Sequence, residues 1–269
     1  MGLHLRSKNS GEGWLLRGDA GEVVWKQVGL VAGKESAMPF GSELPAVTDI
    51  DEDGGDDLIV AQSVIYGAIN GKTGTPLYPP TFMPGPHGFG KWIAYASPTA
   101  ADLDNDGVRD VYLNSRSYAR GGYAACRREG QPMWVEFHDN LEGSDGFGPV
   151  GDFDGDGHME IGVPILNGTL ACLNAADGTL KWKVKMPVVG DVVAGDVNGD
   201  GTMELVFCGL DGWLHAVSGK DGHEAWSIAA SGRPVIADLD GDGSTEVLVV
   251  GSDGVLRVVG QRELAANPK

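Results

Sequence analysis

Short apolar runs alternate along this chain with loops rich in aspartate and glycine. Each run is three or four residues long and follows such a loop at once. The runs lie at 58–60, 111–113, 161–163, 205–207 and 247–250. Their length and their content of Val, Ile and Leu are typical of buried strands rather than of helices. Because a short strand-like segment also precedes each loop, we expect an all-β chain in which each loop joins two strands.

A hairpin pattern that ends in an aromatic residue accompanies these strands. It occupies 14–25, 67–78, 123–134, 170–182 and 214–226, and Trp25, Tyr78, Trp134, Trp182 and Trp226 close it. Asp-Gly and similar dipeptides between alternating runs indicate tight turns. One acidic loop and one hairpin therefore recur together every 42 to 53 residues. A period of this size with about four short strands predicts the blade of a β-propeller.

The repeats predict a single β-propeller domain over residues 1–269. We expect five blades, with modules at about 45–80, 96–137, 146–187, 190–230 and 232–260. Each blade would run from an inner strand through the acidic loop to a second strand, a hairpin and an outer strand. Residues 1–28 begin with a hairpin that no acidic loop precedes, so we expect this segment to close the ring. A six-bladed ring, or a fragment of a larger propeller, stays open as an alternative.

The five acidic loops share one arrangement of side chains. Each has an oxygen-bearing side chain at positions 1, 3 and 5, Gly at position 6 and a carboxylate at position 9. The predicted metal ligands are Asp49, Asp51, Asp53, Asp57, Asp102, Asp104, Asp106, Asp110, Asp152, Asp154, Asp156, Glu160, Asp196, Asn198, Asp200, Glu204, Asp238, Asp240, Asp242 and Glu246. Oxygens at alternate positions around a tight turn converge on one point, as Ca²⁺ requires. The pattern predicts up to five Ca²⁺ ions, whereas any single loop could be an acidic surface turn.

An EF-hand begins in the same way, but the later positions of the loops exclude it. That motif requires a bidentate Glu at position 12 and helices on both sides. Position 12 is apolar in all five loops: Val60, Leu113, Val163, Phe207 and Val249. The loops therefore belong to strands, and we expect their ions to staple the sheets rather than to perform chemistry.

The net charge of -18 argues against two classes of partner. More than half of the 38 acidic residues lie in the five loops, where bound Ca²⁺ would offset them. No basic face is visible, so we expect neither nucleic acid nor an anionic membrane surface as a general partner. The oligomeric state is not predicted.

Compartment is inferred from three weaker signals. Cys126, Cys172 and Cys208 are too few for a disulfide framework, and their apolar surroundings predict buried free thiols. No apolar run is long enough to span a membrane, and the first residues lack the apolar core of a signal peptide. Loops of modest Ca²⁺ affinity suit millimolar Ca²⁺. We therefore expect an extracellular or periplasmic location.

The third module carries a more specific resemblance. Phe147-Gly148 precedes its loop and Gly162-Val163-Pro164 comes after it. With these flanks the modules resemble the FG-GAP/VCBS repeats of calcium-binding β-propellers, the family that includes the integrin α head. The hairpins that end in Trp also resemble quinoprotein-type propeller repeats. The resemblance covers roughly residues 14–260. It implies the fold, and it implies functions as different as adhesion, lectin-like binding and polysaccharide cleavage by lyases.

Three segments depart from the repeat and are the candidates for a functional face: 79–95, 115–123 and 136–147. Aromatic rings stack on sugars, and Arg binds a carboxylate through two hydrogen bonds. The candidate ligand-binding residues are Trp92, Tyr95, Arg116, Tyr118, Arg120 and Tyr123, and the candidate catalytic residues are His87, Tyr95, Arg120 and His138. We expect a calcium-stabilised module that binds a carbohydrate or a protein. The alternatives are a polysaccharide lyase or glycoside hydrolase that uses this face, and a purely structural propeller whose loops are spacers.

Overall fold

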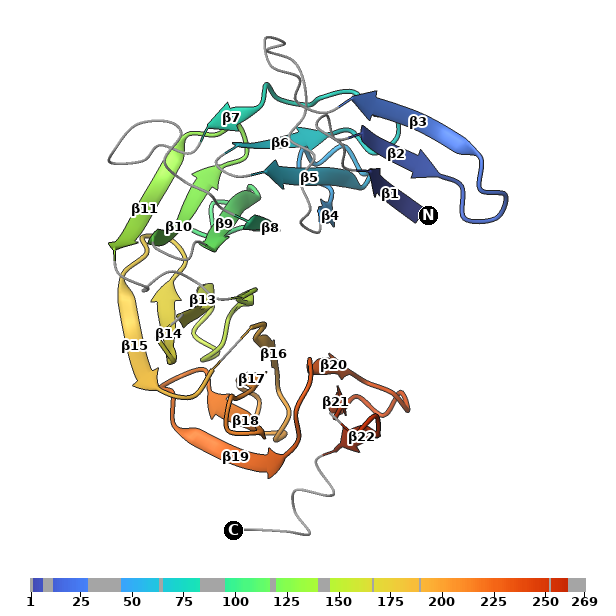
Figure 1. Cartoon of the computed structure of the whole chain (residues 1–269). Coiled ribbons are helices and arrows are strands. Elements are labelled where there is room, and N and C mark those ends of the chain that lie inside the picture. The colour runs from blue at the N-terminus through green and yellow to red at the C-terminus, as the bar shows by residue number, and fades with distance from the viewer. Residues whose placement is uncertain are drawn as a thin grey trace. The chain divides into compact units, whose positions relative to one another are not determined.

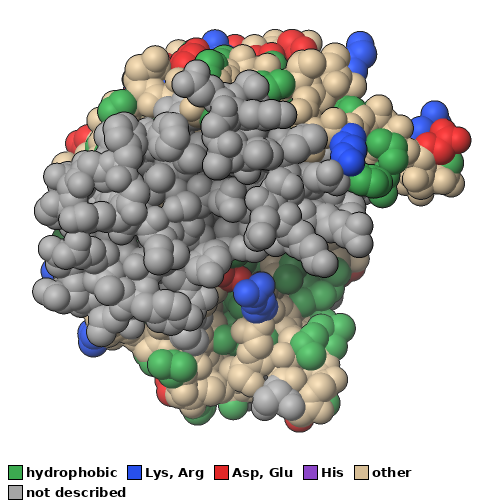
Figure 2. All heavy atoms as spheres, turned by 45° about the horizontal axis from the view of Figure 1, so that its top comes forward, with side chains coloured by type: hydrophobic (Ala, Val, Ile, Leu, Met, Phe, Trp, Pro, Cys, Tyr) green, Lys and Arg blue, Asp and Glu red, His purple; other side chains and the backbone are tan. Residues whose placement is uncertain are grey.

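The computed structural model describes most of the chain. The described residues are 2–6, 12–28, 45–62, 65–82, 95–116, 120–139, 146–165, 167–188, 190–251 and 253–260. Figures 1 and 2 draw the others in grey. The chain divides into two compact units. The first contains Met1–Asp102 with Gly107–Gly143, and the second contains Leu103–Asp106 with Ser144–Lys269.

The described part of the first unit contains three antiparallel sheets, in which neighbouring strands follow one another along the chain (Figure 1). The first sheet consists of β1 (Gly2–Arg6), β2 (Glu12–Leu16) and β3 (Val23–Val28). The second consists of β4 (Ala46–Thr48), β5 (Asp57–Gln62), β6 (Ile65–Ile69) and β7 (Thr81–Phe82). The third consists of β8 (Tyr95–Ala101), β9 (Asp110–Arg116), β10 (Arg120–Arg127) and β11 (Pro132–Asp139).

The described part of the second unit repeats this design. Its first sheet consists of β12 (Val150–Gly151), β13 (Glu160–Ile165), β14 (Thr169–Asn174) and β15 (Leu180–Lys185). The next consists of β16 (Val193–Gly195), β17 (Glu204–Cys208), β18 (Trp213–Ser218) and β19 (Glu224–Ala229). The last consists of β20 (Val235–Ala237), β21 (Glu246–Val250) and β22 (Leu256–Val259). All described regular elements in both units are strands, so the prediction of an all-β chain is confirmed.

The predicted order of strands within a module is also confirmed. In the five sheets that contain an acidic loop, that loop joins the first strand to the second, and a hairpin leads on to the third. Strand β1 is an addition that the sequence did not predict, and it pairs with β2 from Gly2↔Leu16 to Arg6↔Glu12. The residues described thus form six sheets. The closing role of residues 1–28 stays a prediction.

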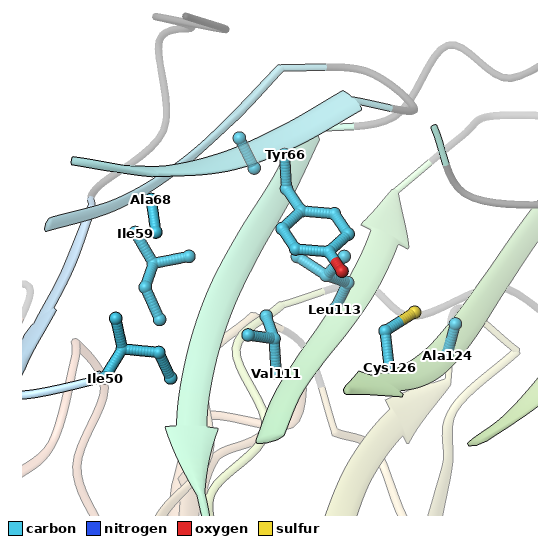
Figure 3. Packing of buried hydrophobic residues seen from close by; sticks show 9 residues of the cluster. Ile50, Ile59, Tyr66, Ala68, Val111, Leu113, Ala124 and Cys126 are labelled. Atoms are coloured by element: carbon cyan, nitrogen blue, oxygen red, sulfur yellow. The ribbon is translucent and has the colours of Figure 1, made fainter. Parts of the chain in front are cut away.

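A single sheet of three or four strands cannot bury its own apolar faces, so neighbouring sheets within a unit pack together and share a core. In the first unit, Ile59 and Tyr66 of the β4–β7 sheet lie in one cluster with Val111, Leu113 and Cys126 of the β8–β11 sheet. Figure 3 shows these side chains between the strands that carry them. In the second unit, Phe153 and Leu170 pack against Leu205 and Phe207 in the same manner. The cores therefore lie between sheets, as packed blades require.

In two sheets, the tryptophan that closes the hairpin bonds to the next sheet. Trp25 Nε1 donates a hydrogen bond to the Gly71 carbonyl at 2.8 Å, and Trp182 Nε1 donates one to the Gly219 carbonyl at 2.7 Å. A Cβ atom on Gly74 would lie 2.6 Å from the Trp25 ring, and one on Gly222 would lie 2.7 Å from the Trp182 ring. Glycine in these hairpin turns therefore provides the space that the incoming ring needs.

The three cysteines are buried and free, as predicted. Burial raises the pKa of Cys126 to about 11 and that of Cys172 to about 12. In the part of the chain that the structure describes, no helix is long and apolar enough to cross a membrane.

Candidate metal centres

The five acidic loops share a backbone conformation that only a few residue types accept easily. The glycine at position 6 has a φ of 87° or 88° in every loop; these residues are Gly54, Gly107, Gly157, Gly201 and Gly243. Position 4 is also left-handed: it is Gly155, Gly199 and Gly241 in three loops, and Glu52 and Asn105 in the other two. Glycine has no Cβ atom and adopts a left-handed φ without strain, whereas most other residues do not. The glycines therefore fix the turn that brings the acids together.

The first aspartate of each loop holds this turn closed. One of its carboxylate oxygens accepts the backbone N–H of the position-6 glycine at 2.9 to 3.0 Å. The pairs are Asp49 with Gly54, Asp102 with Gly107, Asp152 with Gly157, Asp196 with Gly201 and Asp238 with Gly243. These bonds set the turn geometry before any ion binds.

The acid at position 9 ties the loop to the second strand. Glu160 Oε2 accepts the N–H of Phe153, at position 2, at 2.8 Å. Position 9 repeats this bond in the first, fourth and fifth loops, through Asp57, Glu204 and Glu246. Asp57, Asp110, Glu160 and Glu204 are at most 1% exposed, and the apolar residues at position 2 are buried except for Leu239. The first four loops therefore each have a buried carboxylate beneath acids that are half-buried or exposed.

Four clusters of carboxylates in these loops could hold a metal ion, because their oxygens lie within 4.8 Å of one another. The clusters are Asp49 with Asp51 and Asp53, Asp102 with Asp104 and Asp110, Asp152 with Asp154 and Glu160, and Asp238 with Asp240 and Glu246. In the fourth loop Asn198 takes position 3, and its amide donates to Glu204 Oε1 at 2.7 Å. All of these residues are predicted ligands. The ligand roles of all twenty predicted residues stay predictions, including those of Asp57, Asp106, Asp156, Asp196, Asn198, Asp200, Glu204 and Asp242, which lie outside the four clusters.

Burial disfavours the charged form of two of these acids, Glu204 and Asp57. The pKa of Glu204 is raised to about 7, mainly by burial. The backbone hydrogen bond from Val197 lowers this pKa, whereas the negative charges of Asp200 and Asp196 raise it. Burial likewise raises the pKa of Asp57. A divalent cation would reverse both effects, because it favours the charged form of each carboxylate.

A lysine that the repeat pattern does not predict contacts the third loop. Lys181 Nζ lies 2.8 Å from Asp154 Oδ2, 2.8 Å from Glu160 Oε1 and 3.7 Å from Asp156 Oδ2. Burial alone would lower the pKa of Lys181, but the hydrogen bonds to Asp154 and Glu160 raise it. In the second loop, Arg127 Nη1 contacts Asp110 Oδ1 at 3.2 Å.

The three segments that depart from the repeat border one end of the β8–β11 sheet. Strand β8 begins at Tyr95, which pairs directly with Arg116 at the end of β9. Loop 102–110 lies at the opposite end of these two strands. Arg120 pairs with Asp139, and His138 pairs with Gly121. Because adjacent positions alternate between faces, Arg120 and His138 take register positions on opposite faces.

The structure describes this predicted ligand face only in part. His87, Trp92 and Tyr118 lie outside the described residues, and only the backbone is described for Tyr95, Arg116, Arg120, Tyr123 and His138. Their binding and catalytic roles therefore stay predictions.

A second polar cluster that the sequence analysis did not predict surrounds His215. Its Nδ1 lies 2.9 Å from Glu224 Oε1 and its Nε2 lies 3.2 Å from Asp211 Oδ2. The ring stacks on Phe207 with centroids 5.2 Å apart. The arrangement joins strands β18 and β19 to the turn before β18. Nothing in the spacing of Asp211, His215 and Glu224 distinguishes it from ordinary strand and turn residues.

Comparison with known proteins supports the fold. No protein-family model and no curated protein sequence matches the chain, so the FG-GAP/VCBS resemblance stays a prediction. Solved structures do match. BamB from Moraxella catarrhalis is 17% identical with a TM-score of 0.57, and the match covers 95% of this chain and 65% of BamB. Sqt1 from Saccharomyces cerevisiae is 14% identical with a TM-score of 0.62, and the match covers 93% of this chain and 66% of Sqt1.

A third match is BBS1N in complex with ARL6DN. It is 14% identical with a TM-score of 0.59, and the match covers 95% of this chain and 78% of BBS1N. These three proteins are propeller-like. Together with the small antiparallel sheets, they show that the chain has the β-propeller fold. At these identities the likeness shows the fold alone. The chain also spans just under two thirds of BamB and of Sqt1.

Proposed function

We propose that the chain is a calcium-stabilised β-propeller that acts as a binding module outside the cytosol. The observation that carries this proposal is the repetition of one loop geometry in five sheets. In each, the first aspartate caps a left-handed glycine turn, and the acid at position 9 is predicted to complete the ligand set. Ca²⁺ is the cation that accepts many oxygens in flexible geometry, whereas Mg²⁺ requires a near-ideal octahedron.

The ions act as staples in this proposal. Each loop joins the first strand of its module to the second strand, and its predicted ligands come from the loop and from the first residue of that second strand. A bound ion would tie these two strands together and neutralise the acids between them. This accounts for the concentration of acidic residues in the loops of a chain whose net charge is -18.

Calcium binding can be tested by titrating the EGTA-treated chain with Ca²⁺ in a calorimeter. We expect at least two ions per chain and weaker binding of Mg²⁺. Asp238→Asn should remove one ion, because it weakens the fifth loop alone. Asp253→Asn is the matched control, since Asp253 lies in the turn between β21 and β22, outside the acidic loops, and pairs with Arg257 at 2.7 Å. The absence of calcium binding, or equal ion counts in both variants, would contradict the proposal.

The partner is proposed to be a protein or a carbohydrate that contacts the segments 79–95, 115–123 and 136–147. A protein ligand is supported by the likeness to BBS1N, which was solved in complex with ARL6DN. These segments border the sheet end opposite to loop 102–110, so a ligand there would leave that loop undisturbed. A carbohydrate ligand rests on the aromatic and arginine residues of the segments.

The enzyme alternative rests on one observation, the direct pairing of Tyr95 with Arg116 across β8 and β9. A polysaccharide lyase needs a base such as Tyr to remove a proton next to a uronic carboxylate, and a cation to stabilise the charge that develops. A screen of the calcium-loaded chain against acidic and neutral polysaccharides separates the possibilities. Unsaturated products that are lost in Tyr95→Phe would support the lyase, and products that are not unsaturated would support the glycoside hydrolase. Retention of a polysaccharide without products would support a carbohydrate-binding module. Neither retention nor products would leave a protein ligand or a purely structural propeller.

A further inference from the structure

Lys181 occupies an unusual place relative to the third acidic loop. Its ammonium contacts Asp154 and Glu160, each at 2.8 Å, and lies 3.7 Å from Asp156. Three of the four predicted metal ligands of that loop are therefore already in contact with one cation. The Lys181 side chain is only 19% exposed and Glu160 is fully buried, so water screens this contact little.

The backbone explains how the lysine reaches the loop. Cys172 pairs with Trp182 and Leu173 pairs with Leu180, so Lys181 is the extra residue of a β-bulge. A bulge changes the direction in which its extra residue points. The same bulge recurs immediately before the closing tryptophan of three other sheets, where its extra residue is Val24, Met133 or Ala225. The geometry is thus common to four sheets, and only the third loop receives a positive charge from it.

We propose that Lys181 is the built-in cation of the third loop and keeps divalent metal out of it. The ammonium takes up oxygen lone pairs that a metal would need, and its charge would repel a divalent ion held by the same carboxylates. The buried carboxylate of the third loop is then neutralised whether or not calcium is present. The exclusion of metal rests on the proposed calcium binding of the other loops. The stapling role of Lys181, which is to tie strand β15 to the third loop through Asp154 and Glu160, does not rest on it.

The test uses Lys181→Met, which keeps most of the apolar stem, removes the charge and copies the residue at the same bulge in the β8–β11 sheet. The control is Lys183→Met, an exposed lysine on the same strand. Native mass spectrometry in the presence of Ca²⁺ counts the bound ions. We expect Lys181→Met to bind one ion more per chain than either the wild type or Lys183→Met. Equal counts with calcium bound elsewhere would overturn the exclusion of metal while leaving the proposed function intact.

A second measurement tests the lysine without reference to metal. In EGTA, Lys181→Met should lower the unfolding midpoint by about 5 °C or more, because it leaves Glu160 buried without its counter-charge. Lys183→Met should change the midpoint by about 1 °C or less, since it is an exposed position. If neither chain bound calcium but this difference were found, the proposed function would fail and the stapling role of Lys181 would stand. An unchanged midpoint for Lys181→Met would overturn that role.

Discussion

At the scale of single residues, the acidic loops are determined by local chemistry that the sequence displays. Gly at position 6 predicted a tight turn, and its left-handed φ in all five loops confirms it. The apolar residue at position 2 and the carboxylate at position 9 recur at fixed spacing, and hydrogen bonds between them result from that spacing in four loops. Contacts that cross between strands were less predictable. Lys181 reaches Glu160 only because a bulge redirects it, and a bulge depends on strand register.

Reactivity of the thiols offers a test at this scale. Cys126 and Cys172 are fully buried, and burial raises their pKa values to about 11 and about 12. At pH 8 both are therefore protonated as well as inaccessible, and only the thiolate reacts quickly. We expect a thiol reagent to label no cysteine of the native chain within minutes and all three in urea. Rapid labelling of Cys126 or Cys172 in the native chain would show that the cores between the sheets are open.

At the scale of elements, the hairpin that ends in an aromatic residue does more than form two strands. Trp25 and Trp182 each bond to a glycine carbonyl of the next hairpin in their unit. The sequence predicted the hairpins and their closing aromatics, because both arise from local patterns. It did not predict what the rings contact, since that depends on how two sheets pack. It also missed β1, because five residues around Leu3 and Leu5 are too short a pattern to distinguish from a loop.

Gly222→Ala tests this contact between elements. The added Cβ would lie 2.7 Å from the Trp182 ring and would force the ring or the turn to move. We expect a loss of about 2 kcal/mol in unfolding free energy beyond that of Gly212→Ala. Gly212 is the matched control because its φ is also left-handed, at 83°, but its Cβ would meet nothing within 4 Å. Urea unfolding of the two variants measures the difference, and equal stabilities would show that the ring does not fix the hairpin.

At the scale of the whole molecule, the sequence predicted the fold class because the repeat is a global pattern. An acidic loop and a hairpin that recur every 42 to 53 residues indicate blades, and the six described sheets and the likeness to known propellers agree. The number of blades was harder to predict. The sheets β1–β3 and β20–β22 have three described strands each, and the pattern inside a repeat does not say how its ends meet. The proposed ligand face is the hardest feature to predict, because a repeat pattern carries no information about the segments that depart from it.

The measurement that tests the central claim most directly is thermal unfolding of the chain in millimolar Ca²⁺ and in excess EGTA, with Mg²⁺ as the control. Ions that bind only the folded state stabilise it by mass action, by about 2.7 kcal/mol for each site at a hundredfold excess over Kd. With two or more such sites, Ca²⁺ should raise the midpoint by about 10 °C or more, and Mg²⁺ by much less. A midpoint that is the same in Ca²⁺ and in EGTA would contradict the claim that the acidic loops are calcium staples.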